Sequence, residues 1–205
     1  MRVKICGLTT PAAVEAASGA DYAGFIFYPP SPRNLTPAKA AVLTKDIPIP
    51  AVAVTVDPTN ELLKDILAVF KPAYLQLQGN ETPERVQQIK GTFRIHIIKA
   101  FRISTGDDIS KAHAYESAAD MLLFDACVPK GLPGGTGQTF DWKLLAGKQF
   151  RKPWFLSGGL TSDNVEEAMK ISGAKMVDVS SSLESSPGVK DPAKVRTFIK
   201  KVKTG

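Results

Sequence analysis

Short apolar or β-branched segments recur along the chain, separated by longer segments whose apolar residues repeat with helical period. Eight short segments predict strands, at residues 2–7, 22–28, 51–56, 74–79, 94–101, 121–126, 154–159 and 176–181. The clearest helical segments between them are residues 11–20, 36–47, 60–70, 82–91 and 162–174. Several of these open with a capping Thr, Ser, Asp or Asn or with Pro in the first turn, and several end in Gly, which is typical of helices.

Strands that alternate with helices are joined by crossover connections, so the sheet is predicted to be parallel. Eight such units predict an α/β fold of the (β/α)8 or TIM-barrel type, with outer helices and one domain over residues 1–205. A chain of 205 residues lies at the small end for that fold. The main alternative is an open doubly wound sheet, but no predicted strand is followed by a GxGxxG turn.

Composition narrows the class of protein. The chain is 43% apolar and has a net charge of +6, but its basic residues are scattered, and the densest cluster, 200–203, is typical of a solvated helix end. We therefore expect an anionic small molecule rather than nucleic acid as the partner. Charges at Arg2 and Lys4 interrupt any signal peptide, and no apolar run is long enough to span a membrane, so a cytoplasmic protein is expected.

The two cysteines, Cys6 and Cys127, form no CxxC pair, so we expect reduced thiols and neither a disulfide nor a zinc site. The two histidines, His96 and His113, fall in a predicted strand and a predicted helix without metal-ligand spacing, so both are expected to be structural.

Polar residues interrupt several strands that a parallel sheet should bury on both faces. Within each strand the polar residues occupy alternate positions, so their side chains point to the same side. If the Val, Leu and Ile residues between them face the helices, the polar residues face the barrel axis. They are Lys4 and Cys6, Gln76 and Gln78, and Asp178 and Ser180, and Asp125 likewise falls late in its strand. Singly, Cys6 could be a small buried apolar residue and Asp125 a loop cap. Together, at carboxyl ends of barrel strands, they predict an active site.

A second group of residues predicts an anion site. Gly158 and Gly159 follow the seventh strand and precede a helix, so backbone N–H groups are free to face an anion. Ser180 and Ser181 follow the eighth strand. In (β/α)8 barrels the loops after these two strands often hold a phosphate group.

Seven segments in order, "KICGLT", "GFIFYPPSPR", "LQLQG", "LFDA", "GGTGQTFDW", "LSGGLTSDNV" and "VDVSSSLESSPGVKD", together resemble the phosphoribosylanthranilate isomerase family. The resemblance covers nearly the whole chain. It implies a cofactor-free Amadori rearrangement, the third step of tryptophan synthesis from chorismate, in which N-(5'-phosphoribosyl)anthranilate becomes 1-(2-carboxyphenylamino)-1-deoxyribulose 5-phosphate. It leaves monomer and homodimer open.

The resemblance also implies roles for individual residues. Cys6 matches the family's general base and Asp125 its general acid, Arg33 matches the position that meets the anthranilate carboxylate, and Asp178 an acidic position near the substrate. Gly158, Gly159, Ser180 and Ser181 match the phosphate loops. Two positions depart from the family pattern: Gln78 replaces a histidine and Ser182 a glycine.

The chemistry sets requirements for the two catalytic candidates. Asp125 must be desolvated or lie beside another anion, with Asp178 as the candidate, to keep a proton near neutral pH. Cys6 would benefit from a neighbouring cation. Lys4 either favours the thiolate of Cys6 or binds the phosphate. The glycine-rich residues 131–137 are expected to close over the substrate as a lid, the alternative being an idle surface loop.

Two other functions compete with this prediction. Indole-glycerol-phosphate synthase shares the barrel and its phosphate loops, but it closes a ring with a Lys and Glu set. This sequence lacks the N-terminal extension typical of that enzyme and keeps the Cys6 and Asp125 pair. A non-catalytic phosphosugar-binding barrel would need the anion site without Cys6 and Asp125.

Overall fold

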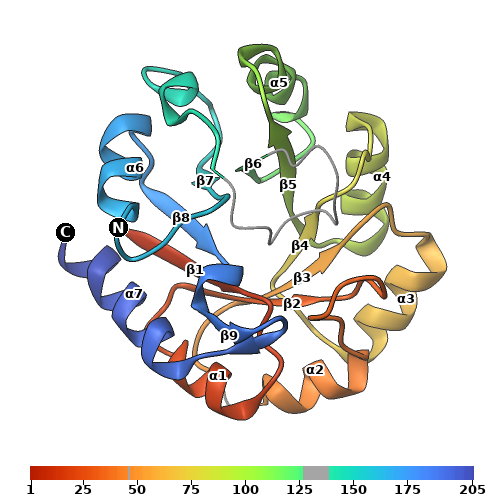
Figure 1. Cartoon of the computed structure of the whole chain (residues 1–205). Helices are drawn as coiled ribbons and strands as arrows, with labels where there is room; N and C mark the ends of the chain where they lie inside the picture. Colours follow the sequence, from red (N-terminus) through yellow and green to blue (C-terminus); the bar gives the residue numbers. More distant parts are fainter. Residues whose placement is uncertain (46, 127–138) are drawn as a thin grey trace.

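A computed structural model describes residues 1–45, 47–126 and 139–205, and in it eight parallel strands close into a barrel in sequence order (Figure 1). The strands are β1 (Arg2–Cys6), β2 (Tyr22–Ile26), β3 (Ala51–Thr55), β4 (Tyr74–Leu77), β5 (His96–Ile103), β6 (Met121–Ala126), β7 (Trp154–Leu156) and β8 (Met176–Val179). β8 pairs with β1 to close the ring, with Lys4 opposite Asp178. The predicted parallel (β/α)8 barrel is confirmed, and the open sheet is wrong.

Helices surround the barrel (Figure 1). They are α1 (Pro11–Ala16), α2 (Pro37–Leu43), α3 (Asn60–Val69), α4 (Pro83–Phe93), α5 (Gly106–Lys111), α6 (Val165–Ser172) and α7 (Pro192–Thr204), with 3₁₀ turns η1 (Ala112–Tyr115), η2 (Trp142–Leu145) and η3 (Ser181–Leu183). Hydroxyls of Thr10, Thr36, Thr59 and Thr82 cap α1 to α4, each accepting a backbone N–H three residues on. The caps at Thr36 and Thr82 are those that the sequence predicts, whereas Thr10 and Thr59 lie one residue before the predicted segments.

Some elements escape prediction from the sequence. The α5 segment "GDDISK" buries only Ile109 and so has no apolar period. An antiparallel hairpin, β9 (Glu184–Ser186) and β10 (Val189–Lys190), lies in a polar stretch that shows no strand pattern. β5 also lies two residues further along than the predicted 94–101. Elements as short as α5, β9 and β10 are held by tertiary contacts rather than by local pattern.

The strands divide their side chains between two layers, as the parity argument predicts. Val3 and Ile5 of β1 belong to the larger apolar cluster beneath the helices, whereas Cys6 packs inside the barrel with residues such as Val52 and Leu123. Inside, the ring of Tyr22 makes edge contacts with Tyr74 and Phe155, at centroid distances of 5.6 and 5.4 Å. These rings pack inside the barrel near the amino-terminal ends of β2, β4 and β7.

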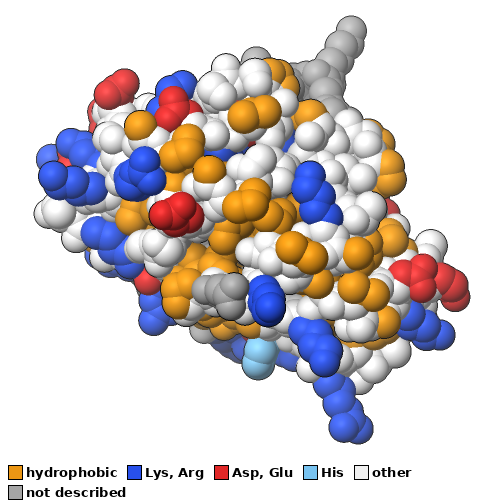
Figure 2. Space-filling model, turned by 90° about the horizontal axis from the view of Figure 1, so that it is seen from below, with side chains coloured by type: hydrophobic (Ala, Val, Ile, Leu, Met, Phe, Trp, Pro, Cys, Tyr) orange, Lys and Arg blue, Asp and Glu red, His pale blue; other side chains and the backbone are white. Residues whose placement is uncertain are grey.

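The outer surface is mixed in character. On the face over α1 and α2, basic side chains are scattered among apolar and neutral ones and form no continuous patch (Figure 2). Val42 on α2 is the most exposed large apolar side chain of the described residues, at 77%. Over the same residues, the helices are all too short or too polar to cross a bilayer.

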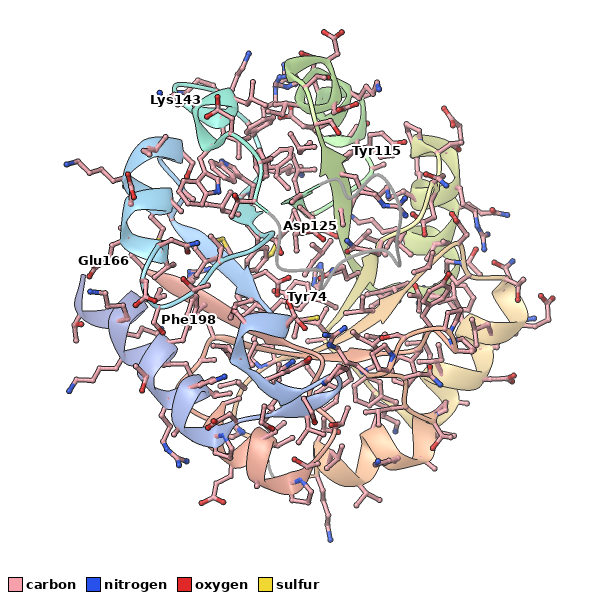
Figure 3. The ribbon with its side chains drawn as sticks, viewed as in Figure 1. Tyr74, Tyr115, Asp125, Lys143, Glu166 and Phe198 are labelled. Atoms are coloured by element: carbon pink, nitrogen blue, oxygen red, sulfur yellow. The ribbon has the colours of Figure 1, made fainter. Side chains whose placement is uncertain are left out.

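Phe198 packs helix α7 against the rest of the fold. It is fully buried on the inner side of α7, which packs against α1 and β1 (Figure 3). Phe198→Ala should lower the free energy of unfolding by about 3 to 5 kcal/mol, because a buried ring leaves a cavity. Urea denaturation measures this. The exposed Val42→Ala serves as the control and should change stability by less than about 0.5 kcal/mol; equal effects of the two would contradict the packing described.

Candidate active site

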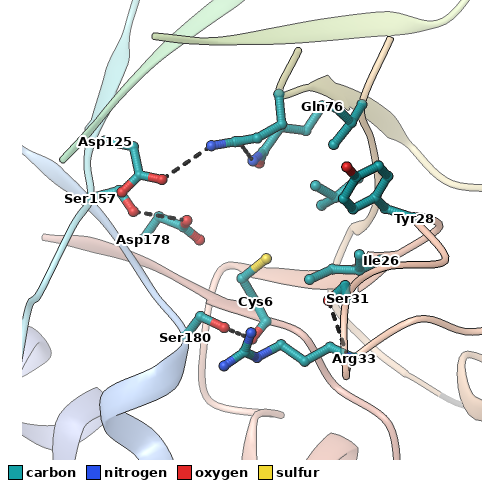
Figure 4. Close-up of a pocket in the computed structure, with 13 residues that line it drawn as sticks. Cys6, Ile26, Tyr28, Ser31, Arg33, Gln76, Asp125, Ser157, Asp178 and Ser180 are labelled. Carbon is teal, nitrogen blue, oxygen red and sulfur yellow. Dashed lines mark hydrogen bonds between the residues drawn. The ribbon is translucent and has the colours of Figure 1, made fainter. Parts of the chain in front are cut away.

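An open pocket lies at the carboxyl ends of the strands (Figure 4). Seven of the predicted site residues line it: Cys6, Arg33, Gln76, Gln78, Asp125, Asp178 and Ser180. Lys4 lies beneath the pocket, fully buried. Gly158, Gly159 and Ser181 lie on the loops beside it rather than in its lining.

Asp125 reaches the pocket from the end of β6, near the centre of the barrel (Figure 3). Its side chain is 6% exposed, and one carboxylate oxygen accepts a hydrogen bond of 3.1 Å from the Gln78 amide. Burial, and then the charge of Asp178, raise the pKa of Asp125 to about 6. The requirement that the sequence set for Asp125, a pKa raised by desolvation and a second anion, is thus met.

Gln78 occupies the position where the family resemblance leads one to expect histidine. Its amide oxygen accepts a bond of 2.7 Å from Gln76, which fixes the direction of the chain of hydrogen bonds from Gln76 through Gln78 to Asp125. Because an amide does not titrate, this neighbour adds no charge beside Asp125 at any ordinary pH.

A buried ion pair forms the floor of the site. The Lys4 ammonium lies 2.8 Å from one oxygen of Asp178, and Ser157 donates a 3.2 Å hydrogen bond to the other. Burial lowers the pKa of Lys4, but attraction by Asp178 and Cys6 outweighs this and leaves that pKa above its usual value. Lys4 therefore keeps its charge inside the barrel.

Cys6 ends β1 above this pair, with a side chain that is 6% exposed. Burial raises the pKa of the Cys6 thiol, although Lys4 and Lys190 act in the opposite direction. The Lys4 ammonium thus favours the thiolate, as one of the two sequence hypotheses holds, but its effect is smaller than that of burial.

Arg33 crosses from the loop after β2 to the far side of the pocket. Its Nε and Nη2 groups donate to the two carboxylate oxygens of Glu184 at 2.6 and 2.8 Å. The side chain passes over Gly7, whose φ is +78° and where a Cβ would lie 2.6 Å from Arg33 Cδ. Glycine is therefore required here both by backbone conformation and by space.

The predicted phosphate loops lie next to each other because β7 and β8 are neighbours. Gly158 and Gly159 both have positive φ, and Asn164 closes their loop by accepting from the Thr161 N–H and donating to the Gly159 carbonyl. Ser182, the second departure from the family pattern, donates its hydroxyl to the Leu160 carbonyl. This serine thus ties the two loops together.

Comparison with known proteins decides the family. The model of a family described as N-(5'phosphoribosyl)anthranilate (PRA) isomerase matches residues 3–201. The chain belongs to the phosphoribosylanthranilate isomerase family. This membership removes indole-glycerol-phosphate synthase as an alternative.

Individual relatives agree with this family. The N-(5'-phosphoribosyl)anthranilate isomerase of Paramagnetospirillum magneticum is 47% identical over all of this chain and 98% of its own. A crystal structure of monomers generated from the dimeric Thermotoga maritima isomerase has a TM-score of 0.85 at 35% identity, covering 99% of this chain and 98% of that one. A structure of the isomerase with reduced 1-(o-carboxyphenylamino)-1-deoxyribulose 5-phosphate has a TM-score of 0.84 at 34% identity, with the same coverage.

Several residues of this isomerase site escape the sequence analysis. Ser157 could have been found, because it lies two residues after the interior Phe155 and so shares its parity. Glu184 and Lys190 carry no such signal, since they lie on the hairpin of β9 and β10.

Other predicted residues lie away from the pocket. His96 and His113 have exposed side chains on β5 and η1. Within residues 1–45, 47–126 and 139–205, no group of three His, Cys, Asp or Glu could hold a metal ion. Cys127 and the predicted lid at 131–137 lie outside the described residues.

The raised pKa of Asp125 predicts a pH-dependent cost to stability. Between the ordinary pKa of 3.8 and about 6, the folded chain keeps a proton that the unfolded chain releases, so stability falls as pH rises through this window. Above it the cost reaches at most about 3 kcal/mol. Asp125→Asn should therefore be more stable than the unaltered protein at pH 8, with a smaller gain at pH 5. Urea denaturation at both values measures this, and an equal gain at both would contradict it.

Proposed function

We propose that this protein converts N-(5'-phosphoribosyl)anthranilate to 1-(2-carboxyphenylamino)-1-deoxyribulose 5-phosphate in tryptophan biosynthesis, with Cys6 as base and Asp125 as acid. The observation that carries the assignment of roles is the shared pocket: the thiol from β1 and the carboxyl group from β6 line one cavity, and that carboxyl group has a pKa of about 6. A proton donor and a proton acceptor on one cavity suit an isomerisation by proton transfer.

Ring opening comes first. Asp125 gives its proton to the furanose ring oxygen while the lone pair of the aniline nitrogen forms a double bond to C1, and the C1–O bond breaks. The product is an open-chain Schiff base that carries the positive charge. A carboxyl group with a pKa of about 6 is still partly protonated near neutral pH, whereas an exposed aspartic acid is not.

Proton removal from C2 follows. The Cys6 thiolate takes this proton, the C2–H electron pair forms the C1–C2 double bond, and the Schiff-base nitrogen is neutralised to give an enolamine. The enolamine tautomerises to the aminoketose. Hydrogen moves from C2 to C1 with no net oxidation, so the reaction requires no redox cofactor, and we propose none.

Lys4 and Asp178 serve this chemistry from below. The fully buried Lys4 is bonded to Asp178 and does not line the pocket, which favours a role in lowering the pKa of Cys6 over a role in binding phosphate. Asp178 raises the pKa of Asp125. Asp178 also raises the pKa of Cys6, so Lys4 lowers that pKa against both burial and its own ion-pair partner.

The two ends of the substrate carry the negative charge. We assign the ring carboxylate to Arg33, and the phosphate to the backbone around Gly158 and Gly159 with Ser180 and Ser181. Gln76 and Gln78, on the wall between them, would contact the sugar. Contiguity of the β7 and β8 loops supports the phosphate assignment.

The remaining features of this proposal come from the sequence and the family. They are a single domain over residues 1–205, a cytoplasmic location, a monomer or homodimer, and no nucleic-acid or membrane partner.

Turnover of the fluorescent substrate tests the two catalytic roles. Cys6→Ala and Asp125→Asn should each lower kcat by about 10² to 10⁴-fold, because each removes one proton-transfer group. The exposed Val42→Ala should keep the full rate. Near-normal rates in both site variants would falsify the roles, and an unaltered protein without turnover would favour a non-catalytic phosphosugar-binding barrel.

The pH profile of kcat/KM tests the pKa assignments. The active form needs Asp125 protonated and Cys6 ionised, although Asp125 has the lower pKa of the two. The value of kcat/KM should rise up to about pH 6, because the Cys6 thiolate accumulates. Above this pH it should stay level, because loss of protonated Asp125 offsets the further gain of thiolate, and it should fall above the raised pKa of the Cys6 thiol. Asp178→Asn removes the anion beside Asp125, so its acid limb should move to lower pH. An unmoved limb would contradict the assignment.

A further inference from the structure

Glu184 lies outside the pocket, yet its carboxylate is bonded to the pocket residue Arg33. It is 5% exposed and accepts from Arg33 Nε and Nη2, from the Lys190 ammonium at 2.6 Å and from the Gly188 N–H at 3.2 Å. Burial alone would raise the pKa of Glu184, but Arg33 and Lys190 outweigh it, so this pKa is below its usual value and the group is ionised near neutral pH.

The geometry of the pair determines which part of Arg33 remains available. Nε and Nη2 form one edge of the planar guanidinium group, and Glu184 occupies that edge with both oxygens. Among the described residues, Nη1 has no hydrogen-bond partner, so the adjacent edge, made by Nη1 and the second hydrogen of Nη2, can receive a second carboxylate. Arg33 lines the pocket, whereas Glu184 does not.

The hairpin that carries Glu184 is fixed to the loop that carries Arg33. Thr9 donates to the Gly188 carbonyl at 2.8 Å, and a Cβ at Gly188 would lie 2.6 Å from the Pro32 carbonyl oxygen. Lys190 also donates to Ser180, whose hydroxyl donates to the Cys6 carbonyl. Glu184 is therefore braced against the ends of β1 and β2.

We propose that Glu184 is a positioning residue, which holds the Arg33 guanidinium so that its free edge meets the ring carboxylate of the substrate. This inference rests on the proposed function. Arg33, Lys190 and Glu184 together carry a net charge of +1, so the cluster still attracts an anion. The role of Glu184 is orientation, since its own charge opposes binding of a carboxylate.

If Glu184 acts by orienting Arg33, Glu184→Gln should weaken substrate binding. If only the net charge of the cluster matters, the same variant should strengthen it. Glu184→Gln raises the net charge of the cluster to +2, which alone would strengthen binding of an anionic substrate. If Glu184 acts by orientation, the variant instead binds the substrate more weakly. The double variant Glu184→Gln with Lys190→Met restores the charge of +1 and separates the two effects.

The experiment compares two substrates, N-(5'-phosphoribosyl)anthranilate and N-(5'-phosphoribosyl)aniline, which lacks the ring carboxylate. Glu184→Gln should lower kcat/KM for the first by roughly tenfold, equivalent to about 1.4 kcal/mol, mainly through KM. For the second it should change kcat/KM less than about twofold. The double variant should lose the same preference for the carboxylated substrate. Turnover of the aniline substrate also shows that each variant is folded.

Three results would overturn the inference. They are tighter binding of the carboxylated substrate by Glu184→Gln, an equal loss on both substrates, and an unchanged preference. The variant Arg33→Met shows whether the positioning role of Glu184 is wrong or whether the proposed role of Arg33 in binding the ring carboxylate is wrong. If Arg33→Met abolishes the preference and Glu184→Gln does not lower it, only the positioning role is wrong. If Arg33→Met leaves the preference intact, the assignment of Arg33 fails as well.

Discussion

The pocket depends on the ion pair between Lys4 and Asp178. Its two members come from β1 and β8, the strands whose pairing closes the barrel, and lie opposite each other in the register. A buried ion pair gains little over apolar packing, because desolvation offsets the attraction. Its value here is electrostatic: the anion raises the pKa of Asp125, and the cation lowers that of Cys6 against the effect of burial. Asp178 raises the pKa of both proposed catalytic groups, and Lys4 opposes this effect at Cys6.

Much of the fold follows from the sequence because it depends on local rules. Alternation from Val3 to Cys6 predicts which side chains face the helices and which face the barrel interior, and Thr36 and Thr82 mark where two helices begin. The charge interaction between Asp125 and Asp178 is of another kind, since it depends on the register and closure of eight strands. The ion pair between Arg33 and Glu184 could not be predicted from the sequence. The two residues are 151 positions apart, and Glu184 lies in a polar hairpin without a strand pattern.

The family resemblance supplied roles that parity could not, but it left open what the departures do. At position 78 the structure has an amide that is oriented by Gln76 and donates to Asp125, so hydrogen bonding there is kept without a second titrating group. At position 182 serine has less backbone freedom than the glycine of the family pattern, but its hydroxyl donates a hydrogen bond to the Leu160 carbonyl. This bond connects the loops after β7 and β8. Both departures preserve local order around the pocket.

The two proposed anion receptors are built on different principles. The phosphate would be held by backbone groups of the β7 and β8 loops, whose direction follows from the chain itself. Arg33 is a long side chain with many rotamers, and an unsupported guanidinium group would lose that freedom on binding, at a cost in affinity. Glu184, Gly7 and the hairpin impose the order beforehand. Because the proposed base Cys6 and the proposed acid Asp125 lie at strand ends, fixing both ends of the substrate would place C2 and the ring oxygen between them.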